Sequence, residues 1–134
     1  SVHNAICGLV SIHAGLTARI SAIAAGDEPL VPALLEAIGM LGPGAPQVLC
    51  LICDAPLPPA YAAPEILPAE TAVLCLRLSL DRGPALALTA MPGHTVPEPL
   101  EPASVLTFLE SERQTLDIPH NGMCWQLRKA DATP

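Results

Sequence analysis

The sequence predicts an α/β fold in which α-helices pack against a mixed β-sheet. Near the start, apolar residues recur at the spacing of an amphipathic helix, and short apolar runs with the length of buried strands follow. These segments come in the order helix, strand, helix, strand, and then further strands with one more helix. Hydrophobic residues make up 51% of the chain and aromatic residues only 2%. The core must therefore consist mainly of Leu, Ile, Val and Ala.

The first helix is predicted for residues 2–14, and Gly15 is expected to end it as the residue just past the last turn. Residues 19–25 are short, mostly apolar and free of Pro, which favours a strand buried on both faces. The apolar positions that define the helix are Val2, Ala5, Ile6, Leu9 and Val10.

A sharp turn then leads into a second helix. We expect Asp27 or Glu28 to cap this helix, with Pro29 in its first turn. Residues 42–44, Gly-Pro-Gly, should end it. The helix carries a wide apolar stripe that predicts deep packing, made of Leu30, Val31, Leu34, Leu35, Ile38 and Leu41.

The rest of the chain is predicted to contain strands, Pro-rich loops and one helix that buries Val105, Phe108 and Leu109. We expect residues 1–134 to form a single domain, because a chain of this length builds one hydrophobic core. In order, the patterns predict a buried strand over 47–55, a loop over 56–70, strands over 71–80 and 85–91 joined by a hairpin turn at 81–84, a loop over 92–102, a helix over 102–114 and a closing strand over 123–129.

The charge and hydropathy of the chain exclude several classes of protein. The net charge is −7 with only six Lys and Arg residues, so a nucleic-acid partner is not expected. Pro, Gly or a charged residue interrupts every apolar stretch before it reaches membrane-spanning length. The opening residues lack a basic segment followed by an apolar one, so no secretory leader is expected. We therefore expect a cytoplasmic protein without a membrane span.

The five cysteines are sparse and odd in number, which favours reduced thiols in a cytosolic protein. Cys50 and Cys53 form a CxxC pair, but residues three apart on a strand face opposite sides, so core packing is favoured over a shared metal. His120 and Cys124 are close in sequence, yet a zinc site needs about four ligands. No metal is expected. No cofactor is expected either, because no phosphate-binding or dinucleotide-binding motif occurs.

Several short motifs resemble those of the β-ketoacyl synthases of the thiolase fold. They are Asn4, Gly8, Ser11-Ile12 and Gly15-Leu16, then an Ile/Ser/Ala segment and a sharp turn into an apolar helix. SVHNA, AAGDE, LLEA and CDAPLPPAY more closely resemble a short synthase-like N-terminal-domain family described as chain-length factors of aryl polyene biosynthesis. The resemblance is strongest over 1–41 and 47–61. It implies a thiolase-like half-fold, a truncated ketosynthase, with an upstream N-terminal portion missing from this sequence.

In ketosynthases this turn carries the acyl-accepting cysteine, and here it contains Gly26, Asp27 and Glu28. By the spacing from Gly15, the place of the cysteine falls on Asp27, to within one residue. A carboxylate at a helix N-terminus is stabilised as an anion by about 0.3–1 kcal/mol, which makes it a poor nucleophile. The family's decarboxylating histidine pair comes from a second half of the fold, which we do not expect in this chain. We interpret Asp27 as a helix cap filling a vacant site and expect no catalytic residue.

The resemblance implies a heterodimer with an active β-ketoacyl synthase. The segment before the turn would pair with the partner across the two-fold axis, and the inactive subunit would help set the length of the acyl or polyene chain. The few basic residues indicate that the partner holds the acidic acyl carrier protein, which this chain would meet only indirectly. The expected interface residues are Asn4, Ile20, Ser21, Ala22, Ile23, Ala24, Gly26 and Asp27.

Two other functions stay open at this point. The chain could be a small stand-alone α/β enzyme, similar to a hydrolase, that uses Asp27 with a histidine. That mechanism requires a base within hydrogen-bond reach of Asp27. Alternatively, the chain could only stabilise a ketosynthase, in which case interface substitutions would lower product yield without changing product length.

Overall fold

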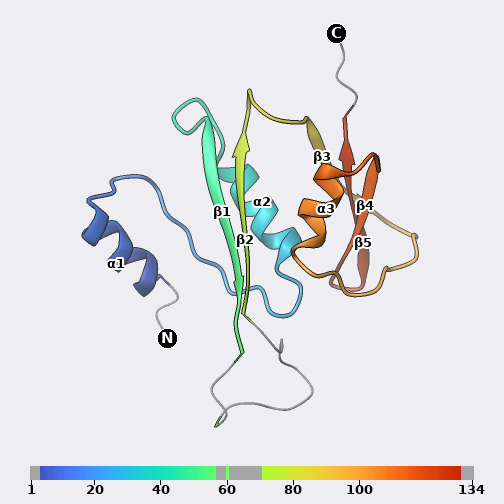
Figure 1. Ribbon diagram of the computed structural model, residues 1–134, viewed down its shortest axis with the longest axis horizontal. Coiled ribbons are helices and arrows are strands. Elements are labelled where there is room, and N and C mark those ends of the chain that lie inside the picture. Colours follow the sequence, from blue (N-terminus) through green and yellow to red (C-terminus); the bar gives the residue numbers. More distant parts are fainter. Residues whose placement is uncertain (1–3, 57–59, 61–70, 131–134) are drawn as a thin grey trace.

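The computed structural model describes residues 4–56, 60 and 71–130. Within them the elements follow one another along the chain as Figure 1 shows. They are α1 (Ala5–Ala14), α2 (Leu30–Met40), β1 (Gln47–Asp54), β2 (Ala72–Ser79), β3 (Leu86–Met91), α3 (Ser104–Glu110), β4 (Thr115–His120) and β5 (Met123–Lys129).

The α/β class predicted from the sequence is confirmed, but the expected mixed sheet is not what forms. Among the described residues the strands make two antiparallel sheets, β1–β2 and β3–β5–β4, with β5 in the centre of the second. The predicted hairpin at residues 81–84 is also wrong, because β2 pairs with β1 and β3 pairs with β5. The chain instead crosses from one sheet to the other there, and Gly83 takes a positive φ of 86° in the crossing.

β4 and its hairpin with β5 were not predicted from the sequence. The helix predicted to run to residue 114 ends at Glu110, and β4 begins at Thr115. Asn121 and Gly122 connect the two strands with φ angles of 52° and 68°, as a tight two-residue turn of the primed type requires. Pro119 is accommodated because β4 is an edge strand.

The hydrophobic core lies between α2, α3 and the two sheets. α2 packs against β1, where the thiol of Cys50 lies 3.8 Å from the carbonyl oxygen of Ala33. The apolar stripe of α2 is narrower than predicted, since Leu35 and Ile38 are 44% and 46% exposed. The core residues are Leu30, Val31, Ala37, Cys50, Ile52, Leu74, Val105, Phe108, Leu116, Ile118 and Leu127.

The strand predicted to be buried over 47–55 is present as β1, but only one of its faces is covered. Cys50 and Ile52 are buried, whereas Leu49 and Leu51 are each 61% exposed. Cys53 is also exposed, so the two cysteines of the CxxC pair do face opposite sides, and core packing holds for Cys50 alone. Most of the predicted loop over 56–70 lies outside the described residues, while 92–102 is a loop as expected.

α1 ends where the sequence predicts. Gly15 has a left-handed conformation with φ of 62°, and the N–H of Leu16 donates to the carbonyl of Ser11 at 2.8 Å. None of its residues is buried, and the helix stands to one side of the sheets in Figure 1. Its apolar face therefore remains uncovered by the part of the chain that the structure describes.

The predicted buried strand over 19–25 is wrong. The segment has no strand pairing within the described residues, and Ile20 and Ile23 are 39% and 47% exposed. An extended segment becomes a strand only when a neighbour satisfies its backbone groups. The expected cap is wrong as well: Pro29 is the N-cap of α2, and no side chain caps the helix. No described helix is long and apolar enough to cross a membrane.

Candidate functional site

The candidate site is built around the turn that precedes α2. Gly26 has a φ of 63°, a left-handed conformation that glycine adopts without strain, and it lets the chain reverse sharply after Ala25. Gly26 and Asp27 are exposed, while Glu28 is half-buried. The turn therefore presents its first two residues to solvent and directs the third inward.

Glu28 joins this turn to the tip of the β4–β5 hairpin. Its Oε2 atom accepts a hydrogen bond from the backbone N–H of Asn121 at 2.7 Å. The short distance is typical of a hydrogen bond to a carboxylate, which is stronger than one between neutral groups. The hairpin tip thus holds the turn in place from the opposite end of the chain.

His120 lies beside the same carboxylate. Its Nδ1 atom is 3.7 Å from Oε2 of Glu28, too far for a hydrogen bond, and it is buried without a hydrogen-bond partner. Its Nε2 atom is 3.3 Å from the side-chain nitrogen of Asn121. When that amide donates to Nε2, the ring proton resides on Nδ1 and faces the glutamate. The three side chains form a small polar cluster at the hairpin tip.

An open pocket of about 500 Å³ adjoins this cluster. Three separate segments contribute to it: the end of the 19–25 segment, one face of α2, and the hairpin tip. The 19–25 segment and α2 contribute apolar residues to the lining, apart from Glu36 of α2. The hairpin tip contributes polar residues. The lining residues are Ile23, Ala24, Ala25, Pro32, Leu35, Glu36, His120 and Asn121.

Comparison with known protein families shows which family the chain belongs to. Residues 1–126 match the family model described as the beta-ketoacyl synthase, N-terminal domain. The chain belongs to this family. No curated protein and no solved structure matches it. The ketosynthase-like family expected from the sequence motifs is thus confirmed, and the small α/β architecture is consistent with a thiolase-like ketosynthase half-fold.

The structure brings only some of the predicted interface residues of this ketosynthase-like chain together. Ile23 and Ala24 line the pocket, and Gly26 and Asp27 follow them directly in the turn. Ile20, Ser21 and Ala22 belong to the same exposed segment. Asn4 lies on a separate element, at the start of α1, where its carbonyl accepts the N–H of Gly8 at 2.8 Å and its side chain makes no cap.

Asp27 makes no side-chain hydrogen bond with any residue that the structure describes. His120 lies beside Glu28 instead, with its Nδ1 atom 3.7 Å from the Glu28 Oε2 atom. His13 on α1 and His94 in its loop are both exposed, and His3 lies outside the described ranges. The residues that the structure describes therefore show no base hydrogen-bonded to Asp27 for a hydrolytic mechanism.

The two buried cysteines of the ketosynthase-like chain, Cys50 and Cys124, are not poised for nucleophilic chemistry. Burial raises the pKa of the Cys50 thiol, and the nearby Cys75 raises it further. Burial also raises the pKa of Cys124, with a smaller contribution from Asp117. A raised pKa lowers the fraction of reactive thiolate at neutral pH. Within residues 4–56, 60 and 71–130, no three metal-ligating side chains are grouped.

His120, Asn121 and Glu28 were not predicted from the sequence to form a site. The Asn-Gly pair between two alternating apolar segments is a strong hairpin signal, and it could have located the tip. No local signal links Glu28 to that tip, because the contact joins residues 93 positions apart.

Proposed function

We propose that this ketosynthase-like chain is a non-catalytic subunit, a chain-length factor of aryl polyene biosynthesis. It would pair with an active β-ketoacyl synthase and help set the length of the acyl or polyene product. The observation that carries this proposal is the uncovered apolar surface of α1 and the 19–25 segment. Ile6 is 74% exposed, Ile12 is 82% exposed and Ile23 is 47% exposed.

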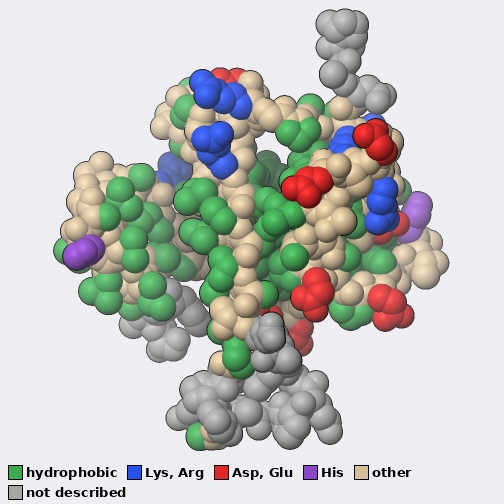
Figure 2. Space-filling view, viewed as in Figure 1, with side chains coloured by type: hydrophobic (Ala, Val, Ile, Leu, Met, Phe, Trp, Pro, Cys, Tyr) green, Lys and Arg blue, Asp and Glu red, His purple; other side chains and the backbone are tan. Residues whose placement is uncertain are grey.

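A surface of this kind supports an interface. Large contiguous apolar patches on soluble proteins usually mark the place where a partner binds. Figure 2 shows hydrophobic side chains spread over α1 and over the centre of the molecule, with few charged groups among them. The large apolar residues exposed on α1 and the following segment are Ile6, Leu9, Val10, Ile12, Leu16, Ile20 and Ile23.

The composition of the turn supports a non-catalytic role. None of the three residues of the turn, Gly26, Asp27 and Glu28, is a cysteine. The carboxylate of Glu28 already accepts a hydrogen bond from the backbone N–H of Asn121. Asp27 is exposed at the place where the resemblance puts the nucleophile. If a carboxylate there attacked a thioester, the product would be a mixed anhydride, which is less stable than the thioester. The partner would therefore supply both the nucleophile and the histidine pair.

The net charge of the chain supports a cytoplasmic complex in which the acyl carrier protein docks on the synthase and not on this subunit. Acyl carrier proteins are acidic, and this chain has a net charge of −7. Repulsion between like charges would disfavour direct docking of the carrier protein. In our proposal the carrier protein binds the active synthase, and this subunit contacts only the growing acyl chain.

Co-expression with an active β-ketoacyl synthase encoded beside it, followed by size-exclusion chromatography with light scattering, tests the proposal. A stable one-to-one complex is expected, with the chain aggregating when it is made alone. A monodisperse monomer that does not bind the synthase would contradict the proposal. If interface substitutions lower yield but leave product length unchanged, the chain only stabilises the synthase.

A further inference from the structure

We propose that Asn121 is a site of spontaneous deamidation, and that the hydrogen bond between its backbone N–H and Glu28 controls the rate. Asn121 is followed by Gly122, and both residues are exposed at the tip of the β4–β5 hairpin. The other asparagine of the chain, Asn4, is followed by Ala5. The reaction needs only water as a co-reactant, so it is independent of the proposed function.

The covalent step joins two neighbouring groups of the hairpin turn. The backbone nitrogen of Gly122 attacks the side-chain Cγ atom of Asn121, and the new N–Cγ bond closes a cyclic imide. The Cγ–Nδ2 bond breaks, and the amide nitrogen leaves as ammonia after taking up the proton that the Gly122 nitrogen loses. Water then opens the ring at either carbonyl group, which gives aspartate or isoaspartate at position 121. No oxidant or reductant is consumed.

Both reacting groups are accessible in the folded hairpin. Within the described residues the N–H of Gly122 donates no hydrogen bond, and no heavy atom lies within 4 Å of the place where a side chain of residue 122 would begin. In the same part of the chain, the amide nitrogen of Asn121 contacts Nε2 of His120 at 3.3 Å and makes no other hydrogen bond. A side chain at position 122 would crowd the attacking nitrogen, and glycine leaves it open.

The backbone of Asn121 opposes the reaction while the turn is intact. Its φ of 52° is set by the two-residue turn, and its N–H donates to Oε2 of Glu28 at 2.7 Å. Ring closure requires the peptide unit between Asn121 and Gly122 to rotate toward the Asn121 side chain. The hydrogen bond to Glu28 resists that rotation. Glu28 is therefore a positioning residue that keeps Asn121 in a less reactive conformation.

Deamidation changes the candidate site at the hairpin tip. Aspartate at position 121 adds a second carboxylate near that of Glu28, and repulsion between like charges disfavours their contact. Isoaspartate carries the main chain through the side-chain carbon, which lengthens a turn that accommodates two residues. Both products therefore weaken the link between the hairpin and the turn before α2, and they alter the pocket wall that His120 and Asn121 form.

Incubation of the full chain at neutral pH, followed by peptide mapping with mass spectrometry, measures aspartate and isoaspartate at both asparagines. Asn121 should convert, whereas Asn4 should not within the same period because the side chain of Ala5 crowds the attacking nitrogen. Glu28→Ala should accelerate conversion of Asn121 roughly fivefold, the change in population expected when one hydrogen bond is lost. Glu98→Ala, at an exposed loop position, should leave the rate unchanged.

Ile52→Val separates local opening of the turn from unfolding of the whole chain. Ile52 is 4% exposed in β1, which does not include the hairpin tip, and loss of a buried methylene lowers global stability by an amount similar to loss of the Glu28 hydrogen bond. Acceleration by Glu28→Ala and not by Ile52→Val supports the proposal. An unchanged rate for Glu28→Ala, or equal acceleration by the two variants, would overturn the role of Glu28. Conversion of Asn121 no faster than that of Asn4 would overturn the site itself.

Discussion

The backbone N–H of Asn121 donates a hydrogen bond to the Glu28 carboxylate at 2.7 Å, across a separation of 93 residues. One partner belongs to the turn that precedes α2, and the other belongs to the tip of the β4–β5 hairpin. The link makes the shape of the turn depend on the folding of β4 and β5. His120, 3.7 Å from the same carboxylate, packs beside this link.

Replacing Glu28 by Ala should destabilise the chain by about 1 kcal/mol, because a hydrogen bond to a charged group is lost at a partly exposed site. Glu28→Gln should retain part of that stability, since its amide oxygen still accepts. Urea denaturation measures the change. Glu98→Ala, at an exposed loop position, is the control and should have no effect. Equal stabilities for the Glu28→Ala and Glu98→Ala variants would show that the link contributes nothing.

Substituting Asp27 by Cys should not create condensation activity in the chain alone. Under the proposed function, the histidine pair that decarboxylates the malonyl unit belongs to the partner, so a thiol at this exposed position would not suffice. Incorporation of labelled malonyl carbon into a longer acyl chain is the measurement, with an active ketosynthase as the positive control. Condensation by the Asp27→Cys variant without a partner would contradict the proposed non-catalytic role.

Ile23→Asp should break the complex with the synthase, because the new carboxylate would place a charge in the proposed apolar interface without a compensating partner. Leu80→Asp is a suitable control, since Leu80 is 63% exposed and follows β2 rather than lying in the 19–25 segment. Light scattering after size-exclusion chromatography reports the mass of each complex. If Ile23→Asp co-elutes with the partner as the wild-type chain does, the interface lies elsewhere.

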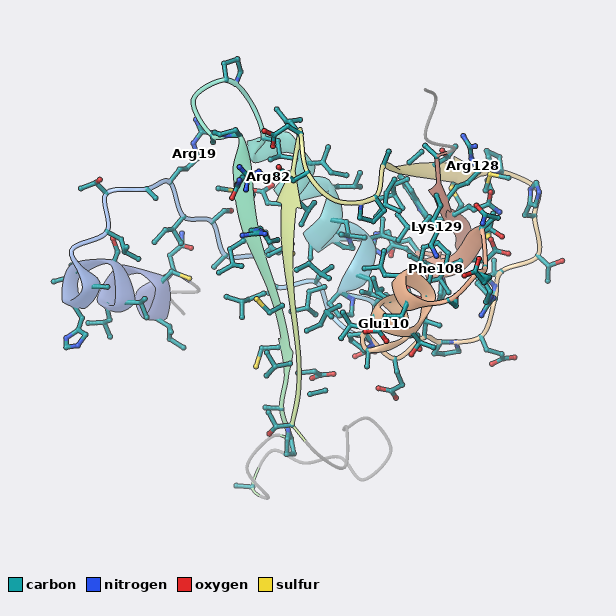
Figure 3. All side chains as sticks on the ribbon, turned by 45° about the horizontal axis from the view of Figure 1, so that its top comes forward. Arg19, Arg82, Phe108, Glu110, Arg128 and Lys129 are labelled. Atoms are coloured by element: carbon teal, nitrogen blue, oxygen red, sulfur yellow. The ribbon has the colours of Figure 1, made fainter. Side chains whose placement is uncertain are left out.

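Truncating Phe108 to Ala should cost about 3–5 kcal/mol, because the ring is only 1% exposed and its removal leaves a cavity. The ammonium group of Lys129 lies 4.9 Å from the centre of the ring, and that contact is lost too. Figure 3 labels both residues. Leu106→Ala on the same helix should change stability by less than about 0.5 kcal/mol, since Leu106 is 43% exposed. Similar losses for the two variants would argue against this packing of α3.

Stability should fall as the pH rises above the ordinary thiol pKa of 9.0. Burial raises the pKa of Cys50 and Cys124 in the folded chain, so the unfolded chain releases these protons first. The favourable contribution is therefore complete below the unfolded pKa and is lost as the pH passes through the folded values. Unfolding free energies measured under reducing conditions from pH 7 to about 10 test this. Cys124→Ala should flatten the decline, whereas the exposed Cys53→Ala should not.

Much of the local structure could be predicted from the sequence. The periodic apolar residues and Gly15 located α1, and Met123–Lys129 was predicted with the bounds that β5 has. The turn before α2 was also located. Each of these depends on neighbours within a few residues, so a local pattern carries the information.

The strand partners and the exposure of each face could not be predicted in the same way. Residues 19–25 have the composition of a buried strand, yet no described segment pairs with them and Ile23 is 47% exposed. β4 was missed because its six residues include Pro119, which argues against a strand anywhere but at an edge. Whether a segment is central, at an edge or unpaired depends on other parts of the chain.

By itself the sequence determined the α/β class, the ketosynthase-like family and the residues of the turn that lacks a cysteine. Only the tertiary structure decided that Glu28, rather than Asp27, carries the contact at this turn, and that His120 and Asn121 complete the pocket wall. The physical reason is one of distance along the chain. Helical periodicity and turn residues act over a few positions, whereas the contact between Glu28 and Asn121 exists only once the β4–β5 hairpin has folded against the start of α2.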